Sequence, residues 1–210
     1  AKWVKPGVTT LKLNQIAEEY IRSQGAVPGF LGLYGFPSTL CISVNENVVH
    51  GIPSNYVLAE GDIVSVDCGA VINGFNGDSA YTFAVGQVAP EVMSLLRTTK
   101  ESLYQGIEKA IAGNRIGDIS NAVQTYCEAR GYSVVREFIG HGIGLVLNEL
   151  PVLAPKSKMV LQAGMTIAVE PKFVIDGVGA VGNENTYIVH KESAMESVSL
   201  APEEIVELKV

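Results

Sequence analysis

Acidic side chains begin or end strand-like runs at four places in this 210-residue chain, and the four form two matching pairs. LAEGDIVSVD ends at Asp67 and LQAGMTIAVE ends at Glu170, while DSAYTF begins at Asp78 and ENTYIV begins at Glu184. Asp67 and Asp78 flank an Asn-Gly turn, which predicts a hairpin that places them across from each other on adjacent strands. Carboxylates this close cannot all stay ionised cheaply, and a divalent metal ion removes that cost. The pattern therefore predicts a metal site.

A His-Gly-Ile triplet also occurs twice, at His50 and at His141. Four carboxylates with the imidazole of His141 suit two hard or borderline ions such as Mn²⁺, Fe²⁺, Co²⁺ or Zn²⁺. Two such ions roughly 3.5–4 Å apart can share a bridging hydroxide for hydrolysis. A single strand-end Asp is more often a turn residue and a single His more often structural, so the recurrence in register carries this prediction. His50 lies outside the ligand set: it either donates to a peptide carbonyl or oxyanion, or fixes the turn before Pro53.

A helix-like segment is repeated as well. GVTTLKLNQIAEEYIRSQG (7–25) matches GNRIGDISNAVQTYCEARG (113–131) at a constant offset of 106. A threonine cap, apolar residues at i, i+3, i+4, i+7 and i+8 from Leu13, and Gly25 at the end predict a helix in the first copy. The second copy predicts a helix over about 118–129. Two related αβ halves, about 1–88 and 89–210, would then form one domain over 1–210 with the site between them.

The remaining elements are predicted from β-branched runs and turn residues. We expect strands at 40–44, 48–50, 61–71, 75–85, 133–139, 165–169 and 185–190. We also expect a long helix over 91–112 with Pro90 near its first turn, a Gly-rich connection at 177–182, and a short turn or helix at 202–208.

Composition limits the class of protein. Hydrophobic residues make up 47% and the net charge is −7 without a basic cluster, which disfavours nucleic acid and anionic membranes as partners. No apolar run reaches the ~18 residues of a membrane span, and no secretory signal is visible. The three cysteines, at 41, 68 and 127, form no CxxC pair. They predict buried free thiols and a cytoplasmic location.

Four segments of the chain, between about residues 4 and 144, resemble the bacterial type I methionine aminopeptidases: VKPGVTTLKLNQIAEEYIRSQGA, CISVNENVVHGIPS, LAEGDIVSVDCGAVINGFNGDSAYTFAVG and VVREFIGHGIG. The resemblance implies the α+β pita-bread (creatinase/aminopeptidase) fold, with two pseudo-two-fold related αβ halves around a curved antiparallel sheet. It also implies a dinuclear metal site. The five ligands would be Asp67, Asp78, His141, Glu170 and Glu184.

The same resemblance implies a role for each ligand. Asp67 would chelate one ion, Asp78 and Glu184 would bridge the pair, and His141 and Glu170 would complete the other. Glu170 would also act as general base and proton carrier.

Residues outside the ligand set receive roles by the same match. His50 falls where the family histidine contacts the substrate near the scissile bond, and Phe30, Phe36 and Cys41 fall in its methionine side-chain pocket. From the residues alone, the apolar cluster before Cys41 is either plain core or a wall for a hydrophobic side chain.

The chain departs from the family pattern in three ways. The family usually has another helix before VKPGVTT, which this chain lacks. After GHGIG the family carries a second histidine, and Asn148 stands in its place here. From about residue 145 the tail, with NELPVLAPKS and VEPKFVIDGVGAVGNENTYIV, resembles the Xaa-Pro peptidases, and only 14 positions separate Glu170 from Glu184. The chain is therefore a mosaic of two related patterns.

The function favoured by the sequence is a metalloaminopeptidase that removes N-terminal methionine from peptides and nascent proteins with a small second residue. One alternative is an Xaa-Pro dipeptidase or aminopeptidase on the same fold, supported by the tail. The other is a catalytically silent pita-bread binding module. The missing histidine and helix favour silence, whereas the presence of all five ligands argues against it. Native metal and oligomeric state stay open.

Asn148 gives the first testable prediction. Asparagine can hydrogen-bond but cannot shuttle a proton or carry positive charge, so it reduces catalysis at this position. We expect Asn148→His to raise turnover of a methionyl peptide. The measurement is kcat for both proteins under the same metal loading, and an unchanged rate would remove Asn148 as the limiting feature.

Overall fold

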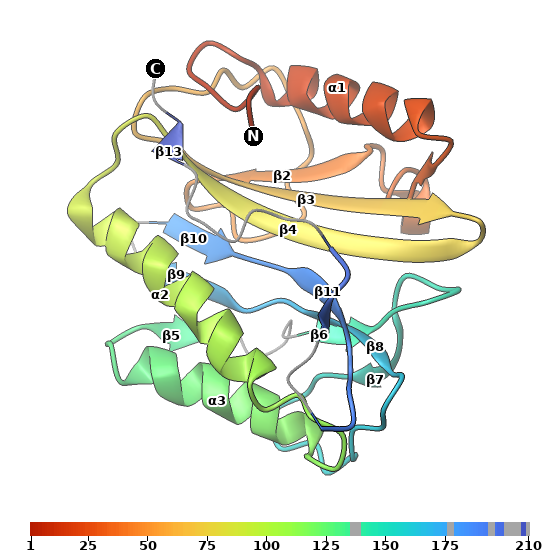
Figure 1. The fold of residues 1–210 in the computed structure, drawn as a ribbon. Helices are drawn as coiled ribbons and strands as arrows, with labels where there is room; N and C mark the ends of the chain where they lie inside the picture. Colours follow the sequence, from red (N-terminus) through yellow and green to blue (C-terminus); the bar gives the residue numbers. More distant parts are fainter. Residues whose placement is uncertain (135–139, 176–178, 193–195, 200–206, 209–210) are drawn as a thin grey trace.

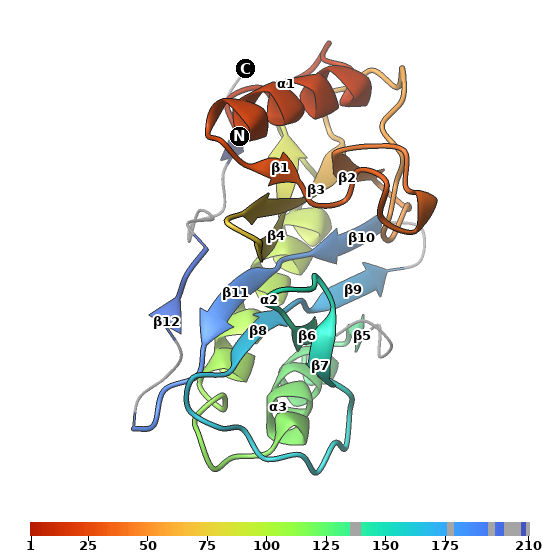
Figure 2. The same cartoon turned by 90° about the vertical axis from the view of Figure 1, so that its right-hand side faces the viewer.

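The strands among the described residues form three sheets in the computed structural model (Figures 1 and 2). The structure describes residues 1–134, 140–175, 179–192, 196–199 and 207–208. The first sheet contains β1 (Val27–Pro28), β2 (Leu40–Val44), β3 (Ile63–Ile72), β4 (Phe75–Val85) and β13 (Glu207–Leu208). The second contains β5 (Ser133–Val134), β9 (Lys172–Ile175) and β10 (Gly179–Gly182). The third contains β6 (Gly140–Gly142), β7 (Glu149–Val152), β8 (Thr166–Val169), β11 (Asn185–Ile188) and β12 (Glu196–Ser197).

In the described part of the chain, three α-helices flank these sheets: α1 (Thr10–Ser23), α2 (Pro90–Ile107) and α3 (Ile116–Glu128). α1 lies along the first sheet, whereas α2 and α3 pack side by side at the other end of the molecule (Figure 1). A short 3-10 turn at Leu33–Gly35 follows β1. No helix among the described residues has the length and apolar character of a membrane span.

The helix predictions are confirmed, with one boundary corrected. The side chain of Thr9 accepts a hydrogen bond from the backbone N of Lys12 and caps α1, and Gly25, at φ +75°, follows its end. α2 ends at Ile107 instead of continuing to 112. The reason is that the chain turns out of the helix so that Ile111 can form a β-bridge with His190.

The hairpin of β3 and β4 is the longest paired unit and confirms the Asn-Gly prediction. Asn73 and Gly74 have φ +52° and +82°, the left-handed pair that a tight two-residue turn needs. The acids are not directly across from each other: Asp67 faces Ala80, and Asp78 faces Gly69. They are therefore diagonal neighbours on one face of the hairpin, still within side-chain reach.

The two faces of this hairpin are buried against different elements. Val64 and Phe83 belong to a core cluster that includes Leu13 of α1. Ile63 and Ala84 belong to another cluster, which includes residues of α2, α3, β9 and β10. Successive residues of a strand point to opposite faces, so both acids face away from α1.

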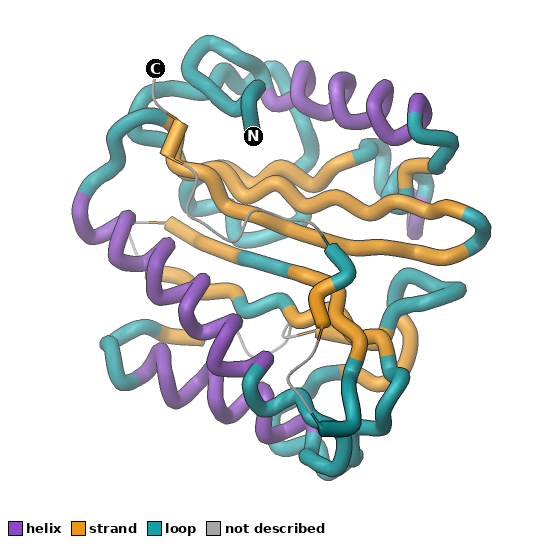
Figure 3. Tube along the Cα trace, in the orientation of Figure 1, coloured by secondary structure: helices purple, strands orange, loops and turns teal. Residues whose placement is uncertain are grey.

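A seam of hydrogen bonds joins β4 to the segment that leads from β10 into β11, and Figure 3 shows this segment running beside β4. Backbone N of Ala80 donates to the carbonyl of Glu184 at 3.1 Å, and N of Glu184 donates back at 2.8 Å. The hydroxyl of Thr82 donates to the carbonyl of Gly182 at 2.7 Å. The seam places residues about 100 positions apart in the sequence on neighbouring strands.

Three other sequence predictions need correction. The described part of the expected connection, 179–182, is strand β10, because it pairs with β9. The tail at 207–208 is a strand that pairs parallel with β4. Segment 48–50 is not a strand: His50 has φ +56°, and contact with β2 is made by Gly51. Residues 135–139, 176–178 and 202–206 of other predictions lie outside the described residues.

Gly51 gives a prediction for stability. Its carbonyl accepts a hydrogen bond from N of Ile42 at 2.8 Å, and a Cβ there would lie 2.1 Å from the carbonyl oxygen of Ile42. Gly51→Ala should therefore lower the free energy of unfolding by about 1–3 kcal/mol, measured by urea denaturation. Gly77→Ala is the matched control, because a Cβ at Gly77 would meet nothing within 4 Å. Equal stability of the two variants would contradict this assignment.

Candidate metal centre

One cavity of about 690 Å³ contains every site residue that the sequence analysis singled out. The five predicted ligands line it together with His50, Asn148 and the three predicted pocket residues, which are Phe30, Phe36 and Cys41. The hairpin of β3 and β4 supplies Asp67 and Asp78, and β6 supplies His141. Glu170 directly follows β8, and Glu184 directly precedes β11. Five separate strands therefore meet at one place.

The acids and the imidazole converge closely. One ligand atom from each of Asp78, His141 and Glu184 lies within 4.8 Å of the other two. Nε2 of His141 lies 3.8 Å from Oδ2 of Asp78, 3.9 Å from Oε1 of Glu184 and 4.0 Å from Oε1 of Glu170. The carboxyl group of Asp67 hydrogen-bonds to that of Asp78. The predicted set therefore shares one space.

The tautomer of His141 suits a cation. Its Nδ1 lies 2.9 Å from the carbonyl oxygen of Gly142, and a carbonyl can only accept a hydrogen bond. Nδ1 therefore carries the hydrogen of the neutral ring, and the lone pair of Nε2 faces the carboxyl groups. A second hydrogen bond of this kind is the usual way in which a metal-binding histidine is oriented.

Three carboxylate oxygens at the centre have no hydrogen-bond partner among the described residues. They are Oδ1 of Asp67, Oδ1 of Asp78 and Oε1 of Glu184, and all three are buried. A buried acceptor without a partner costs roughly 1–3 kcal/mol, and more when it is charged. A divalent cation would satisfy these oxygens, so the residues present fit a metal ion.

Protonation in the metal-free chain follows from the same burial. Burial raises the pKa of Asp67 to about 7, against the opposing charge of Lys172. Burial and the neighbouring carboxyl groups raise the pKa values of Asp78 and Glu184 well above their ordinary range. Without a cation, the cluster therefore keeps protons that a metal ion would displace.

Lys172 is the site residue that the sequence reasoning missed. Its side chain is only 9% exposed, lines the cavity and pairs with Oε2 of Glu170. Burial opposes its charge, but Glu170 and Glu184 hold the pKa of Lys172 above its ordinary value. The sequence did contain a signal for it: Lys172 stands two positions after the predicted ligand Glu170. Residues i and i+2 of an extended chain point to the same face, so the lysine could be expected to face the site.

An apolar wall bounds the other side of the cavity. Phe30, Cys41 and Leu147 form a buried cluster with Ile143, and Leu33 and Phe36 pack against it. Burial, followed by the charge of Asp67, raises the pKa of the Cys41 thiol to about 12, so it lines the wall as a neutral group. Phe30, Leu33 and Phe36, which precede Cys41 in the sequence, therefore belong to a hydrophobic core cluster and also line the cavity. Tyr34, at 89% exposed, does not join it.

His50 and Asn148 lie at the exposed side of the cavity. Partial burial and the charge of Lys172 lower the pKa of His50, so its imidazole is neutral at pH 7. A neutral imidazole can donate one hydrogen bond to a carbonyl oxygen.

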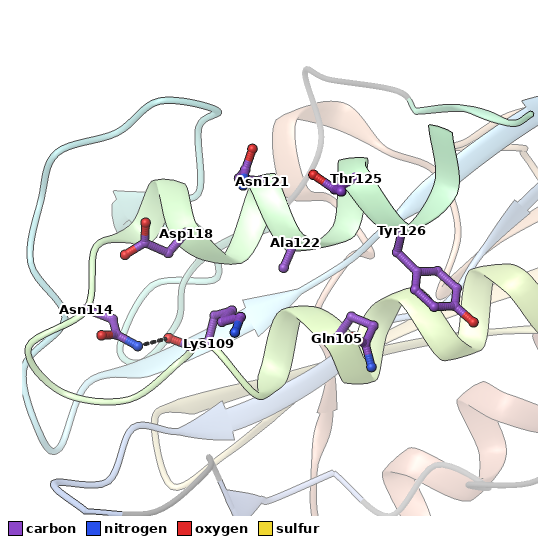
Figure 4. Close-up of a pocket in the computed structure, with 8 residues that line it drawn as sticks. All are labelled: Gln105, Lys109, Asn114, Asp118, Asn121, Ala122, Thr125 and Tyr126. Atoms are coloured by element: carbon purple, nitrogen blue, oxygen red, sulfur yellow. Dashed lines mark hydrogen bonds between the residues drawn. The ribbon is translucent and has the colours of Figure 1, made fainter. Parts of the chain in front are cut away.

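A second hollow between α2 and α3 does not contain these groups (Figure 4). It measures about 560 Å³ and is lined mainly by polar side chains. The one acid in its lining, Asp118, already accepts a hydrogen bond from the backbone N of Arg115. The chemistry of the molecule therefore belongs to the carboxylate and imidazole cavity.

The fold and this site define a metallopeptidase. The model of metallopeptidase family M24 matches residues 1–191, and the chain belongs to that family. The family and the acid–imidazole group imply divalent metal ions. The similar solved structures confirm the expected pita-bread fold.

Two groups of relatives resemble the chain. It is 47% identical to a methionine aminopeptidase of Clostridium perfringens over 95% of this chain and 86% of that protein. It is 48% identical to methionine aminopeptidase 1 of Bacillus subtilis over 81% of this chain and 70% of that protein. A methionine aminopeptidase of Thermotoga maritima has a TM-score of 0.89 at 35% identity, covering 93% and 87% of the two chains. An Xaa-Pro dipeptidase of Bacillus anthracis has a TM-score of 0.87 at 29% identity, and the match covers 97% of this chain and 56% of that one.

The raised pKa values predict how stability depends on pH. Asp67 keeps its proton in the folded, metal-free chain up to about pH 7, but the unfolded chain loses it near pH 4. Between pH 4 and pH 7 the folded state therefore binds more protons than the unfolded state. The free energy of unfolding then falls as pH rises through this range, by about 1.4 kcal/mol per pH unit for each such proton.

The measurement is urea unfolding of chelator-treated protein from pH 4.5 to 8. Asp67→Asn is the matched control, because it removes the titrating proton while keeping the shape of the side chain. We expect a stability difference between variant and wild type that grows in favour of the variant with pH. Added Mn²⁺ should reverse that trend, because it binds the ionised carboxylates. Parallel pH curves for the two proteins would contradict the assignment.

Proposed function

We propose that this chain is a methionine aminopeptidase, which removes N-terminal methionine from peptides whose second residue is small. The observation that carries the proposal is the shared cavity: the apolar wall of Phe30 and Cys41 opens directly onto the carboxylate and imidazole group. An unbranched apolar side chain can lie against the wall while the backbone of the same residue meets the charged group.

The metal centre is proposed to hold two divalent ions, Mn²⁺, Co²⁺, Fe²⁺ or Zn²⁺, on Asp67, Asp78, His141, Glu170 and Glu184. When bound, such ions polarise a carbonyl group and lower the pKa of water. The three buried oxygens without a hydrogen-bond partner support this assignment. With the ions bound, the centre would also hold the free α-amine of a peptide, which favours cleavage at the N-terminus.

The remaining residues have positioning and proton-transfer roles in this proposal. Glu170 accepts the proton of the attacking water at its carboxylate and delivers it to the departing amine. His50, neutral and at the open side of the cavity, donates a hydrogen bond to the carbonyl oxygen of the scissile bond. The wall formed by Phe30 and Cys41 orients the first side chain and excludes water from it. Asn148 can contact the substrate but cannot supply a proton.

An Xaa-Pro peptidase is the second candidate. Its support is the likeness to the Bacillus anthracis dipeptidase over nearly the whole chain and the short spacing of 14 positions between Glu170 and Glu184. The higher identity to methionine aminopeptidases and the apolar wall favour the first candidate.

We further propose that the domain consists of two related halves, about 1–88 and 89–210. Support comes from α1 and α3, whose first residues, Thr10 and Ile116, keep the offset of 106 found in the sequence. The three cysteines are free thiols, which supports a cytoplasmic location.

Substrate choice tests the proposal. The protein is loaded with Mn²⁺ or Co²⁺ and given Met-Ala-Ser or Leu-Pro, and the released amino acid is measured. We expect release of methionine and none from Leu-Pro. Glu184→Gln is the control variant: it removes one charged ligand, and we expect at least about a 10²-fold loss of rate together with a loss of bound metal.

The other outcomes decide between the candidates. Cleavage of Leu-Pro alone would replace the proposal with the Xaa-Pro peptidase. Metal demonstrably bound without cleavage of either peptide would overturn peptidase activity, and absence of bound metal after loading would support the silent module.

A further inference from the structure

The apolar wall of the cavity continues outward to its mouth. Tyr34 and Ile52 both line the cavity, yet they are 89% and 59% exposed. Tyr34 stands between Leu33 and the residues up to Phe36, both of which pack against the buried cluster of the wall. Exposed apolar side chains gathered at the opening of a cavity are typical of a surface that binds a ligand.

The backbone at Tyr34 has an unfavourable conformation. Its φ of +50° and ψ of 25° lie in the left-handed region, which a bulky residue rarely adopts. A tight turn imposes this conformation: N of Phe36 donates to the carbonyl of Leu33 at 2.9 Å, and N of Gly32 donates to the carbonyl of Phe36 at 2.8 Å. Strain of this kind gathers at sites that bind ligands. An asparagine would fit the same backbone more easily, so the turn by itself does not require a tyrosine.

The loop that carries Leu147 presents two more exposed apolar side chains, those of Leu145 and Val146. Leu147 itself is buried in the wall and lines the cavity. The loop is held in shape because the carboxylate of Glu149 accepts a hydrogen bond from the backbone N of Val146 at 2.6 Å. Apolar groups therefore continue from the wall to the surface on this segment as well.

A peptide that is bound as proposed must leave the cavity through this mouth. Its first side chain lies against the inner wall, and its later residues pass His50 and Asn148 at the exposed side. In an extended chain each residue advances about 3.3 Å, and successive side chains point to opposite sides. The third side chain therefore points to the same side as the first and lies about 7 Å further out. That position is the mouth, where the wall continues as Tyr34 and Ile52.

We propose that the mouth is a second apolar subsite, in which Tyr34 and Ile52 bind an apolar side chain at the third residue of the peptide substrate. Leu145 and Val146 extend the same surface beside Leu147. This inference rests on the proposed function and extends its substrate class from the first two residues to the third. The fourth side chain points to the opposite side and does not meet this surface.

Two peptides of identical composition test the subsite: Met-Ala-Leu-Ser and Met-Ala-Ser-Leu. Both are given to the full chain loaded with Mn²⁺, and kcat and KM are measured from the released methionine. We expect kcat/KM to be about 10-fold higher for the peptide with leucine third, which is the factor that partial burial of one leucine side chain provides. The difference should lie mainly in KM, because the third residue is bound equally before and during the reaction.

Variants on two segments separate binding from stability. Tyr34→Asn removes the ring and introduces a residue that tolerates the left-handed backbone, so its stability in urea should not fall below that of the wild type. Its preference for leucine at the third position should fall to about 2-fold, and Ile52→Ser should change the preference in the same direction. Tyr20→Asn and Val160→Ser are the matched controls, because both residues are exposed and lie outside the cavity lining. Both should keep the wild-type preference.

Equal kcat/KM for the two peptides in the wild type would overturn the subsite. An unchanged preference in Tyr34→Asn and Ile52→Ser would also overturn it, and a loss of stability in those variants would then mean that the side chains serve the fold alone. In either case the release of methionine would leave the proposed function standing. No release from any methionyl peptide, Met-Ala-Ser included, would overturn the proposed function and the subsite with it.

Discussion

Mutual repulsion of buried carboxylates is the constraint on which this structure depends. Asp67, Asp78, Glu170 and Glu184 face one space, and burial makes their ionised forms expensive. Proteins tolerate such a group only when cations or protons compensate it. The ammonium of Lys172, paired with Glu170, is the chain's own contribution to that balance. The remaining charge explains why the fold and the metal have to be considered together.

The strands are arranged so that this repulsion cannot be relieved by movement of one segment. Both faces of the hairpin of β3 and β4 are packed, and the seam fixes Glu184 beside Ala80 with two backbone hydrogen bonds. His141 is fixed by its bond to Gly142. A rigid frame of this kind holds ligand atoms in place before a metal arrives, and it also provides the apolar wall opposite them.

The sequence predicted much of this because the strongest signals are local or repeated. The Asn73-Gly74 turn, the threonine cap of α1 and the strand-end acids each follow from neighbouring residues. The predictions failed where contacts with distant segments determine the local structure. Ile111 lies outside the predicted helix because it pairs with His190, and 179–182 is a strand because it pairs with β9. Lys172 was missed because its burial depends on Gly182 and Glu170 together.

The seam between β4 and β11 also governs when the site can exist during synthesis of the chain. Ala80 leaves the ribosome 104 residues before Glu184, an interval of roughly 5–20 s at ordinary elongation rates. During that interval Asp67 and Asp78 are a pair of acids on a hairpin, which His141, then Glu170 and finally Glu184 can join only after each has been synthesised. Closing the loop between Ala80 and Glu184 costs chain entropy, and this cost comes before any carboxylate of one half meets a carboxylate of the other. Metal capture is therefore a late event, and it marks a nascent chain whose last strands have docked.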